Sequence, residues 1–110
     1  MIYSGNDDQI VPIMSLGGIG VISVLSNVCP KLTVEMTRLA LEGKFKEAAA
    51  MQIKLIPFIN ALFSEVNPIP VKAAMHELGF CQNKLRLPLV PMSQPKHQKM
   101  LEIMKELGLI

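Results

Sequence analysis

The sequence is poor in the residues on which many small functional domains depend. Its 110 residues include no tryptophan, a single tyrosine and only two cysteines, and aromatic residues make up 5% of the chain. Cys29 and Cys81 are far apart and fit neither zinc-ligand nor redox spacing, so we expect two reduced, buried thiols. The chain also has no phosphate-binding loop and no cluster of metal ligands, and we therefore expect no metal and no cofactor.

The chain also lacks a strong excess of positive or negative charge. The formal net charge is +2, and the eleven lysines and arginines are spread along the chain without forming a run. This excludes the basic surface typical of proteins that bind nucleic acid, so we expect no nucleic-acid partner. Half of the residues are hydrophobic and 18% are charged, which predicts one small domain with a packed core.

One long stretch lacks charge altogether. No charged residue occurs between Asp8 and Lys31, which is long enough to raise the question of a membrane span. Pro12, Gln9 and Asn27 lie inside this stretch, together with glycines and serines, and lipid would leave their polar groups unsatisfied. We therefore expect no membrane partner. The N-terminal residues also lack the basic segment of a secretory signal.

The first 25 residues have the pattern of a strand, a helix and a second strand. Residues 1–4 are predicted as a short strand, residues 5–8 as a turn in which Asn6 or Asp7 caps the next helix, and residues 21–24 as the second strand. Because a helix connects them, the two strands should be parallel. Between them, apolar residues recur at helical spacing until Gly17 and Gly18: Ile10, Ile13, Met14 and Leu16.

The rest of the chain is predicted to be helical. We expect helices over residues 30–41, 45–65, 71–78 and 95–107, with a kink at Pro57 and an extended connection over 83–93. The predicted fold class is mostly α with one βαβ unit, divided into a strand-helix-strand region, 1–28, and a helical region, 29–110. Two strands with apolar faces have unpaired edges, so this region invites pairing with another chain.

Four sequence motifs occur in a fixed order: SGND at 4–7, GGIGVISVLSN at 17–27, NPIPVK at 67–72 and LRLP at 85–88. On these motifs the chain resembles the C-terminal part of the dihydrodipicolinate synthases, class I aldolases in the superfamily of N-acetylneuraminate lyase. The resemblance implies that residues 1–25 correspond to the last two strands of a TIM (β/α)8 barrel. It implies that residues 26–110 correspond to the eighth barrel helix and a helical C-terminal extension. A whole barrel needs about 250 residues.

The resemblance implies a reaction and also an incomplete site. Members of the family are cytoplasmic lyases of lysine biosynthesis, which condense pyruvate with aspartate semialdehyde through a Schiff base on a lysine, with a tyrosine as proton relay. Both catalytic residues belong to parts of the enzyme upstream of this chain. We therefore expect no catalytic residue here and no activity of the chain alone.

What the resemblance does carry over is a wall of the substrate site. Gly5 and Asn6 match the end of one barrel strand, although the family usually has Asp in place of Asn6. Gly20 and Ile22 match the next strand, where the Ile22 carbonyl faces the reactive centre in the family. Family members often assemble as dimers of dimers, and Leu16 matches a position near one contact, so we expect Leu16 at an interface.

Other interpretations of the sequence stay open. Lys72 is the best local candidate for a substitute Schiff-base lysine, although a lysine on a helix surface usually keeps its ammonium in water. One alternative is a non-catalytic helical module that self-associates, or pairs with a missing barrel half through its free strands. A fragment of a sister 2-keto acid aldolase or lyase is a further alternative, and a complete small enzyme is the least supported.

Overall fold

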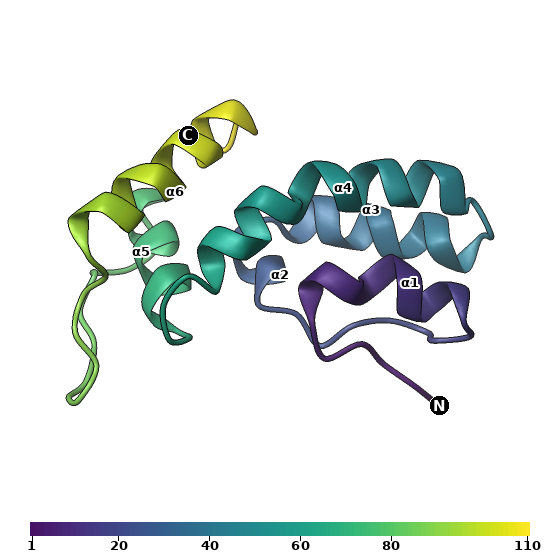
Figure 1. The fold of residues 1–110 in the computed structure, drawn as a ribbon, viewed down its shortest axis with the longest axis horizontal. Helices are drawn as coiled ribbons and strands as arrows, with labels where there is room; N and C mark the ends of the chain where they lie inside the picture. The colour runs from purple at the N-terminus through teal and green to yellow at the C-terminus, as the bar shows by residue number, and fades with distance from the viewer. The chain divides into compact units, whose positions relative to one another are not determined.

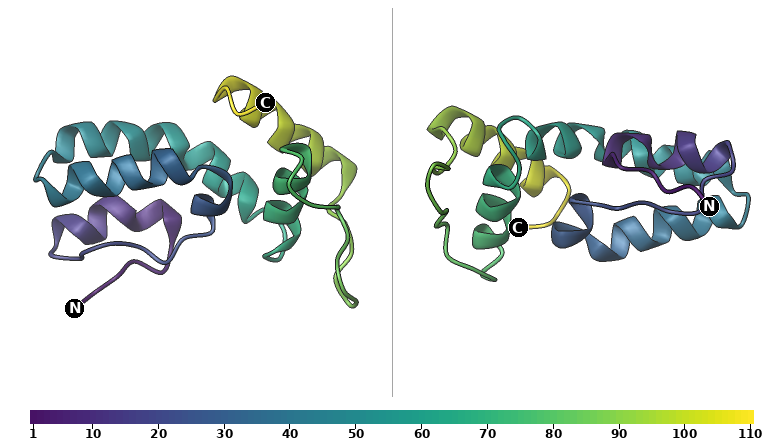
Figure 2. Two further views of the ribbon diagram at one scale, coloured as in Figure 1. Left: turned by 180° about the vertical axis from the view of Figure 1, so that it is seen from behind. Right: turned by 90° about the horizontal axis from the view of Figure 1, so that it is seen from below.

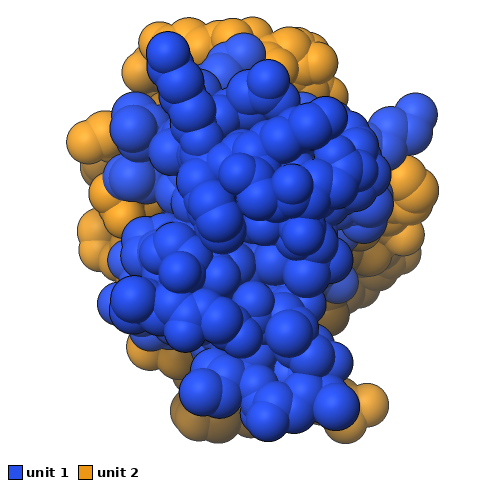
Figure 3. Space-filling view, turned by 90° about the vertical axis from the view of Figure 1, so that its right-hand side faces the viewer, with its two compact units in different colours: residues 1–59 blue, residues 60–110 orange.

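The computed structural model describes residues 1–110 and is mostly helical, as predicted (Figure 1). The chain forms two compact units, Met1–Ile59 and Asn60–Ile110, coloured separately in Figure 3. The predicted boundary at residue 28 separates a strand-helix-strand region from a helical region, whereas these units are two compact parts of the packed chain. The predicted boundary therefore stays a prediction. No helix is long and apolar enough to cross a membrane. The elements are η1 (Asp7–Gln9, a 3₁₀ helix), α1 (Ile10–Ser15), α2 (Leu25–Val28), α3 (Pro30–Leu41), α4 (Phe45–Leu62), α5 (Ile69–Glu77) and α6 (Gln94–Glu106).

The two predicted strands do not form as regular strands. The segments run parallel, as expected, but they share one isolated bridge, between Ser4 and Val21. The Ser4 N–H donates to the Gly20 carbonyl and the Ile22 N–H to the Ser4 carbonyl, both at 2.9 Å. A parallel pair of this length has no third segment to extend its ladder, and sheets usually need at least three strands for stability.

The end of α1 depends on two glycines. Gly17 has a φ of +102°, a conformation that side chains with a Cβ rarely adopt, and its N–H donates to the Met14 carbonyl at 3.1 Å. At Gly18 a Cβ would lie 2.9 Å from the Ile13 carbonyl oxygen, and the Gly18 N–H donates to that same oxygen at 3.0 Å. Gly17 and Gly18 therefore stop the helix and turn the chain towards the Val21 segment.

Helix α3 organises the rest of the first unit. Pro30 occupies its first turn, where a proline is tolerated, and the helix begins and ends as predicted. It packs against α1 and α2, and the left view of Figure 2 shows α1 beside α3. Its buried face consists of Thr33, Met36, Leu39 and Ala40. Helix α2, a single turn, was not predicted.

Helix α4 differs in part from the prediction. It ends at Leu62 rather than at residue 65, and Pro57 lies inside it. Ala48, Leu55 and Ile59 are buried as expected. Phe63 was assigned to the same apolar face, but it lies beyond the helix and is exposed, because the chain turns after Leu62.

The second unit pairs α5 with α6. Polar contacts supplement the apolar packing between its segments. The Glu65 carboxylate accepts the Ser93 N–H at 2.9 Å at the start of α6, and His97 Nε2 lies 3.2 Å from the Glu77 carboxylate at the end of α5. The two helices begin and end within two residues of their predicted bounds.

Candidate functional site

The residues expected to form a substrate wall lie next to one another. The register that pairs Ser4 with Val21 brings Gly5 level with Ile22, and it places Gly20 beside the preceding segment. Gly5, Asn6 and Ile22 therefore lie at one end of a two-segment parallel pair, just beyond the Ser4–Val21 bridge, and Gly20 lies one position before that bridge.

Several polar groups at this end have no partner within the chain. The Ile22 N–H is used in the bridge, but the Ile22 carbonyl accepts no hydrogen bond, and the Ile22 side chain is 73% exposed. Gly5 is exposed, with no atom within 4 Å of the position its Cβ would take. Asn6 is also exposed, and its side-chain amide forms no hydrogen bond. The free polar groups at this end therefore include the Ile22 carbonyl and the Asn6 side-chain amide.

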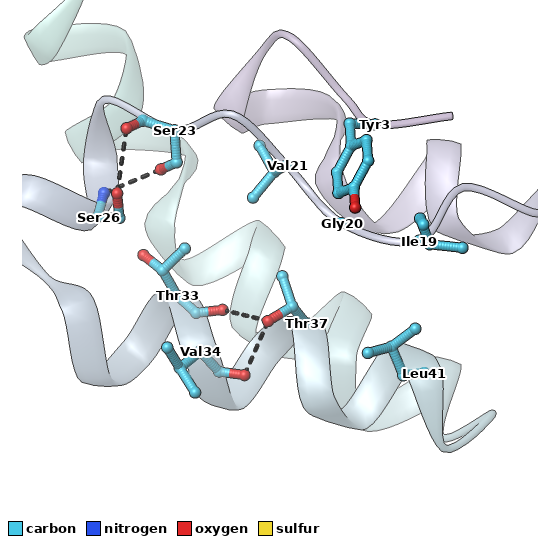
Figure 4. Close-up of a pocket in the computed structure, with 10 residues that line it drawn as sticks. All are labelled: Tyr3, Ile19, Gly20, Val21, Ser23, Ser26, Thr33, Val34, Thr37 and Leu41. Carbon is cyan, nitrogen blue, oxygen red and sulfur yellow. Dashed lines mark hydrogen bonds between the residues drawn. The ribbon is translucent and has the colours of Figure 1, made fainter. Parts of the chain in front are cut away.

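Gly20 lies at a close approach to the Tyr3 ring. It is buried, and a Cβ at this position would lie 3.2 Å from two carbons of the Tyr3 ring. Figure 4 shows the ring standing over the backbone of Gly20. A Cβ at this position would require the half-exposed Tyr3 ring to shift by a few tenths of an ångström.

Asp7 fixes the path of the second segment, and this role was not predicted. The side chain is 2% exposed. One carboxylate oxygen accepts the N–H groups of Val24 and Leu25 at 3.0 Å each, at the start of α2, and the other accepts the Ser23 hydroxyl. Asn6 or Asp7 was expected to cap the next helix, but neither η1 nor α1 has a side-chain cap. The carboxylate instead caps a helix that begins 18 positions further along the chain, where the helix terminus favours an anion.

Gln52 supports the same region from α4. Its side chain is 4% exposed, its Nε2 donates to the Asp7 carbonyl at 2.9 Å, and its Oε1 accepts the Val11 N–H at 3.1 Å. Both contacts join residues more than 40 positions apart, so sequence reasoning had no local signal for them. A Ser before a short helix was a usable signal at Ser23, whose hydroxyl oxygen accepts the Ser26 N–H at 2.9 Å.

A groove of about 290 Å³ lies between the Val21 segment and α3 (Figure 4). Its lining contains no charged residue. Thr33 and Thr37 face it from α3, with the Thr37 hydroxyl bound to backbone carbonyls of its own helix. The groove surface is mainly apolar, and its polar side chains are hydroxyls, with no histidine, carboxylate, amine or thiol among the lining groups. The lining residues are Tyr3, Ile19, Gly20, Val21, Ser23, Ser26, Thr33, Val34, Thr37 and Leu41.

The two cysteines are free thiols in different environments. Cys29 is 3% exposed, and burial raises the pKa of its thiol to about 11. Cys81 is exposed, so the expectation that both thiols are buried was wrong for this residue. It follows α5 in a polar turn, where its carbonyl lies 2.9 Å from His76 Nδ1.

The remaining sequence candidates lie elsewhere. Lys72 and His76 are on α5 in the second unit, where Lys72 is half-buried and His76 is exposed. Leu16 ends α1 with 88% of its surface exposed.

The sequence of residues 1–107 matches the model of the dihydrodipicolinate synthetase family. The chain belongs to this family. Among curated relatives, 4-hydroxy-tetrahydrodipicolinate synthase of Alkaliphilus oremlandii is 52% identical over 109 residues, which are 99% of this chain and 38% of the relative. The synthase of Methanocaldococcus jannaschii is 51% identical over 110 residues, again 38% of its length.

Solved structures of the family agree with the fold. Dihydrodipicolinate synthase from Thermotoga maritima superposes with a TM-score of 0.97 at 46% identity, over 100% of this chain and 37% of that one. The Acinetobacter baumannii synthase, solved with pyruvate, gives a TM-score of 0.94 at 37% identity, over 98% of this chain and 37% of that one. The chain thus spans less than two-fifths of the relatives it matches, and it is a C-terminal fragment of the family's enzymes.

Proposed function

We propose that the chain supplies one wall of the active site of a 4-hydroxy-tetrahydrodipicolinate synthase and lacks the nucleophile of that site. The whole reaction, in this proposal, condenses pyruvate with aspartate semialdehyde. The family match over residues 1–107 and the identity above 50% to named synthases support this assignment. Ser4 and Val21 would belong to the last two strands of a (β/α)8 barrel, whose active sites lie at the carboxyl ends of the strands.

The chemistry in the whole enzyme begins outside this chain. A lysine amine adds to the keto carbon of pyruvate, and water leaves as the imine forms. The protonated imine accepts electrons, so a methyl proton can be removed and the resulting enamine carbon can attack the aldehyde carbon of the second substrate. The lysine and the relay tyrosine come from the N-terminal part of the enzyme.

In this proposal, the chain positions the substrate and forms one side of the site that surrounds it. The observation that carries the proposal is the free Ile22 carbonyl beside Gly5 and Asn6, at the end of paired segments. A fixed carbonyl can accept a hydrogen bond from a hydroxyl or protonated group of the reacting substrate, and Gly5 leaves room for the substrate to approach. The isolated chain is expected to be inactive, and cytoplasmic location and assembly into oligomers are carried over as parts of the proposal.

Two measurements test this function. Intact mass of the purified chain, after pyruvate and borohydride, should show no pyruvyl adduct, because the Schiff-base lysine in this proposal lies outside the chain. Co-expression with the N-terminal part of the Alkaliphilus oremlandii synthase, up to the residue matching Met1, should restore product formation. An adduct on Lys72 that is abolished by Lys72→Arg would overturn the proposal, as would a folded complex of the two parts that forms the Schiff base but no product.

A further inference from the structure

Asp7 connects the two halves of the proposed wall. It directly follows Gly5 and Asn6 in the sequence, and its carboxylate binds the stretch of chain that continues from Ile22. The carboxylate accepts the Ser23 hydroxyl, and it accepts the N–H groups of the next two residues at 3.0 Å each. Three consecutive residues bound to one carboxylate therefore hold the backbone immediately after Ile22.

The peptide unit that carries the Ile22 carbonyl is held from both sides. On one side, the Ile22 N–H donates to the Ser4 carbonyl at 2.9 Å. On the other side, the peptide unit ends at Ser23, whose hydroxyl binds Asp7, and the N–H of Val24 binds the same carboxylate. Because a peptide unit is planar, fixing the residues at its two ends leaves its carbonyl little freedom of direction.

The Asp7 carboxylate itself is shielded from any substrate. It is 2% exposed, and both of its oxygens are occupied by the three donors, so the side chain acts through the backbone that it holds. Asn6 is held separately, because the Ser4 hydroxyl donates to the Asn6 carbonyl at 2.7 Å and accepts the Asn6 N–H at 3.2 Å. Loss of the Asp7 side chain should therefore release the Ile22 half of the wall and leave the Asn6 half in place.

We propose that Asp7 is a positioning residue for the reaction, whose carboxylate fixes the direction of the Ile22 carbonyl as an acceptor for the reacting substrate. This inference rests on the proposed function, because it assigns the Ile22 carbonyl to that active site. An acceptor that is already in place stabilises a transition state without reorganising, and a small misplacement of such a group is costly in rate. Loss of Asp7 should therefore lower kcat by at least about tenfold and change the KM for pyruvate by less than about threefold.

The test uses the complex of this chain with the N-terminal part of the Alkaliphilus oremlandii synthase. Intact mass after pyruvate and borohydride counts the sites that form the Schiff base, and turnover is expressed per such site. Asp7→Ala should show the loss of kcat, and Asp7→Asn should recover part of it, because its amide oxygen can still accept the backbone N–H groups. Ile59→Ala is the matched control: Ile59 is 2% exposed on α4, so its truncation also destabilises the fold, but kcat per site should stay within about twofold of wild type.

Ser23→Ala decides the question if Asp7→Ala does not fold, because it removes only one of the three hydrogen bonds. It should lower kcat per site by about threefold or more, and an unchanged kcat would overturn the proposal. Equal kcat per site in Asp7→Ala and Ile59→Ala would also overturn it, as would a raised KM with an unchanged kcat. A wild-type complex that forms the Schiff base but no product would instead refute the proposed function.

A measurement on the chain alone tests the positioning without catalysis. The Ser23 N–H belongs to the same peptide unit as the Ile22 carbonyl, so its NMR order parameter reports how firmly that unit is held. The order parameter should be about 0.85 in the wild-type chain and in Ile59→Ala, and it should fall below about 0.6 in Asp7→Ala or, if that variant does not fold, decrease in Ser23→Ala. Equal order parameters in the wild-type chain and the variant would show that Asp7 does not hold the carbonyl.

Discussion

Among the polar side chains of the first unit, we expect the Asp7 carboxylate to contribute most to the free energy of unfolding. It is 2% exposed and accepts three hydrogen bonds, from Ser23, Val24 and Leu25. Asp7→Ala would leave all three donors without their acceptor. A hydrogen bond to a charged group contributes about 1.5 kcal/mol or more, and water can recover part of this, so we expect a loss of about 3–4 kcal/mol. That is a large share of the roughly 5–15 kcal/mol of a typical domain.

Asp7→Asn measures the contribution of the negative charge, because asparagine has nearly the same shape as aspartate but is neutral. The amide oxygen can still accept the two backbone N–H groups, but the negative charge at the start of α2 disappears and the amide nitrogen meets the Ser23 hydroxyl. We expect a loss of about 1–2 kcal/mol, smaller than for alanine. The proper control is Asp8→Ala, because Asp8 is the next residue, carries the same charge, is exposed and forms no side-chain hydrogen bond.

Urea unfolding followed by circular dichroism at 222 nm, at one low protein concentration, measures these losses. Asp8→Ala should change the free energy of unfolding by no more than about 0.5 kcal/mol. Hydrogen exchange should also show faster exchange of the α2 amides in Asp7→Ala than in the control. If Asp7→Ala and Asp8→Ala unfold at the same urea concentration, the carboxylate does not stabilise the junction, and the reasoning is wrong.

Three further outcomes follow from single groups. Gln52→Leu removes both long-range hydrogen bonds of that side chain, so the free energy of unfolding should fall by about 2 kcal/mol in urea titrations, and equality with wild type would refute this. Cys81 should react with a thiol reagent at pH 8 in the folded chain, whereas Cys29 should react only when the chain unfolds. Because the Cys29 thiol pKa is raised to about 11, its contribution to stability is complete below pH 9 and is lost as the pH rises towards 11, so urea midpoints should fall over that window. Gly18→Ala should lower the melting temperature, because its Cβ has no room beside Ile13, whereas Gly5→Ala should not; an unchanged melting temperature in Gly18→Ala would contradict this steric argument.

The helices could be predicted because their signals are local. Pro30 in the first turn and the positive φ of Gly43 mark the two ends of α3, and both are readable from residue type alone. The same is true of α5 and α6, which begin near prolines and end before Gly79 and Gly108. Helix α2 has only four residues and no apolar periodicity, so its existence depends on a distant carboxylate rather than on its own sequence.

The candidate site residues were chosen only through the motifs that resemble a family, and their role in substrate binding stays a prediction. Composition and spacing located the glycines, but they did not show that Gly5 and Ile22 would lie side by side. The role of Asp7 was missed because an acid in a turn before a helix has an ordinary local explanation, and its actual partners begin at Ser23 in the sequence. Long-range polar contacts of this kind produce no periodic pattern in the sequence.

The difference between the predicted strands and the observed single bridge has a physical cause that also bears on function. A strand gains stability from neighbours on both edges, and here each segment has only one neighbour, so the ladder stops at Ser4 and Val21. The path of the second segment nevertheless persists, because Gly18 fixes its beginning and Asp7 fixes its end through contacts within the first unit. The free Ile22 carbonyl is therefore held in position before any further strand is added. A partner that supplies strands has only to pair with edges that are already arranged, which lowers the entropy that ordering would cost on binding.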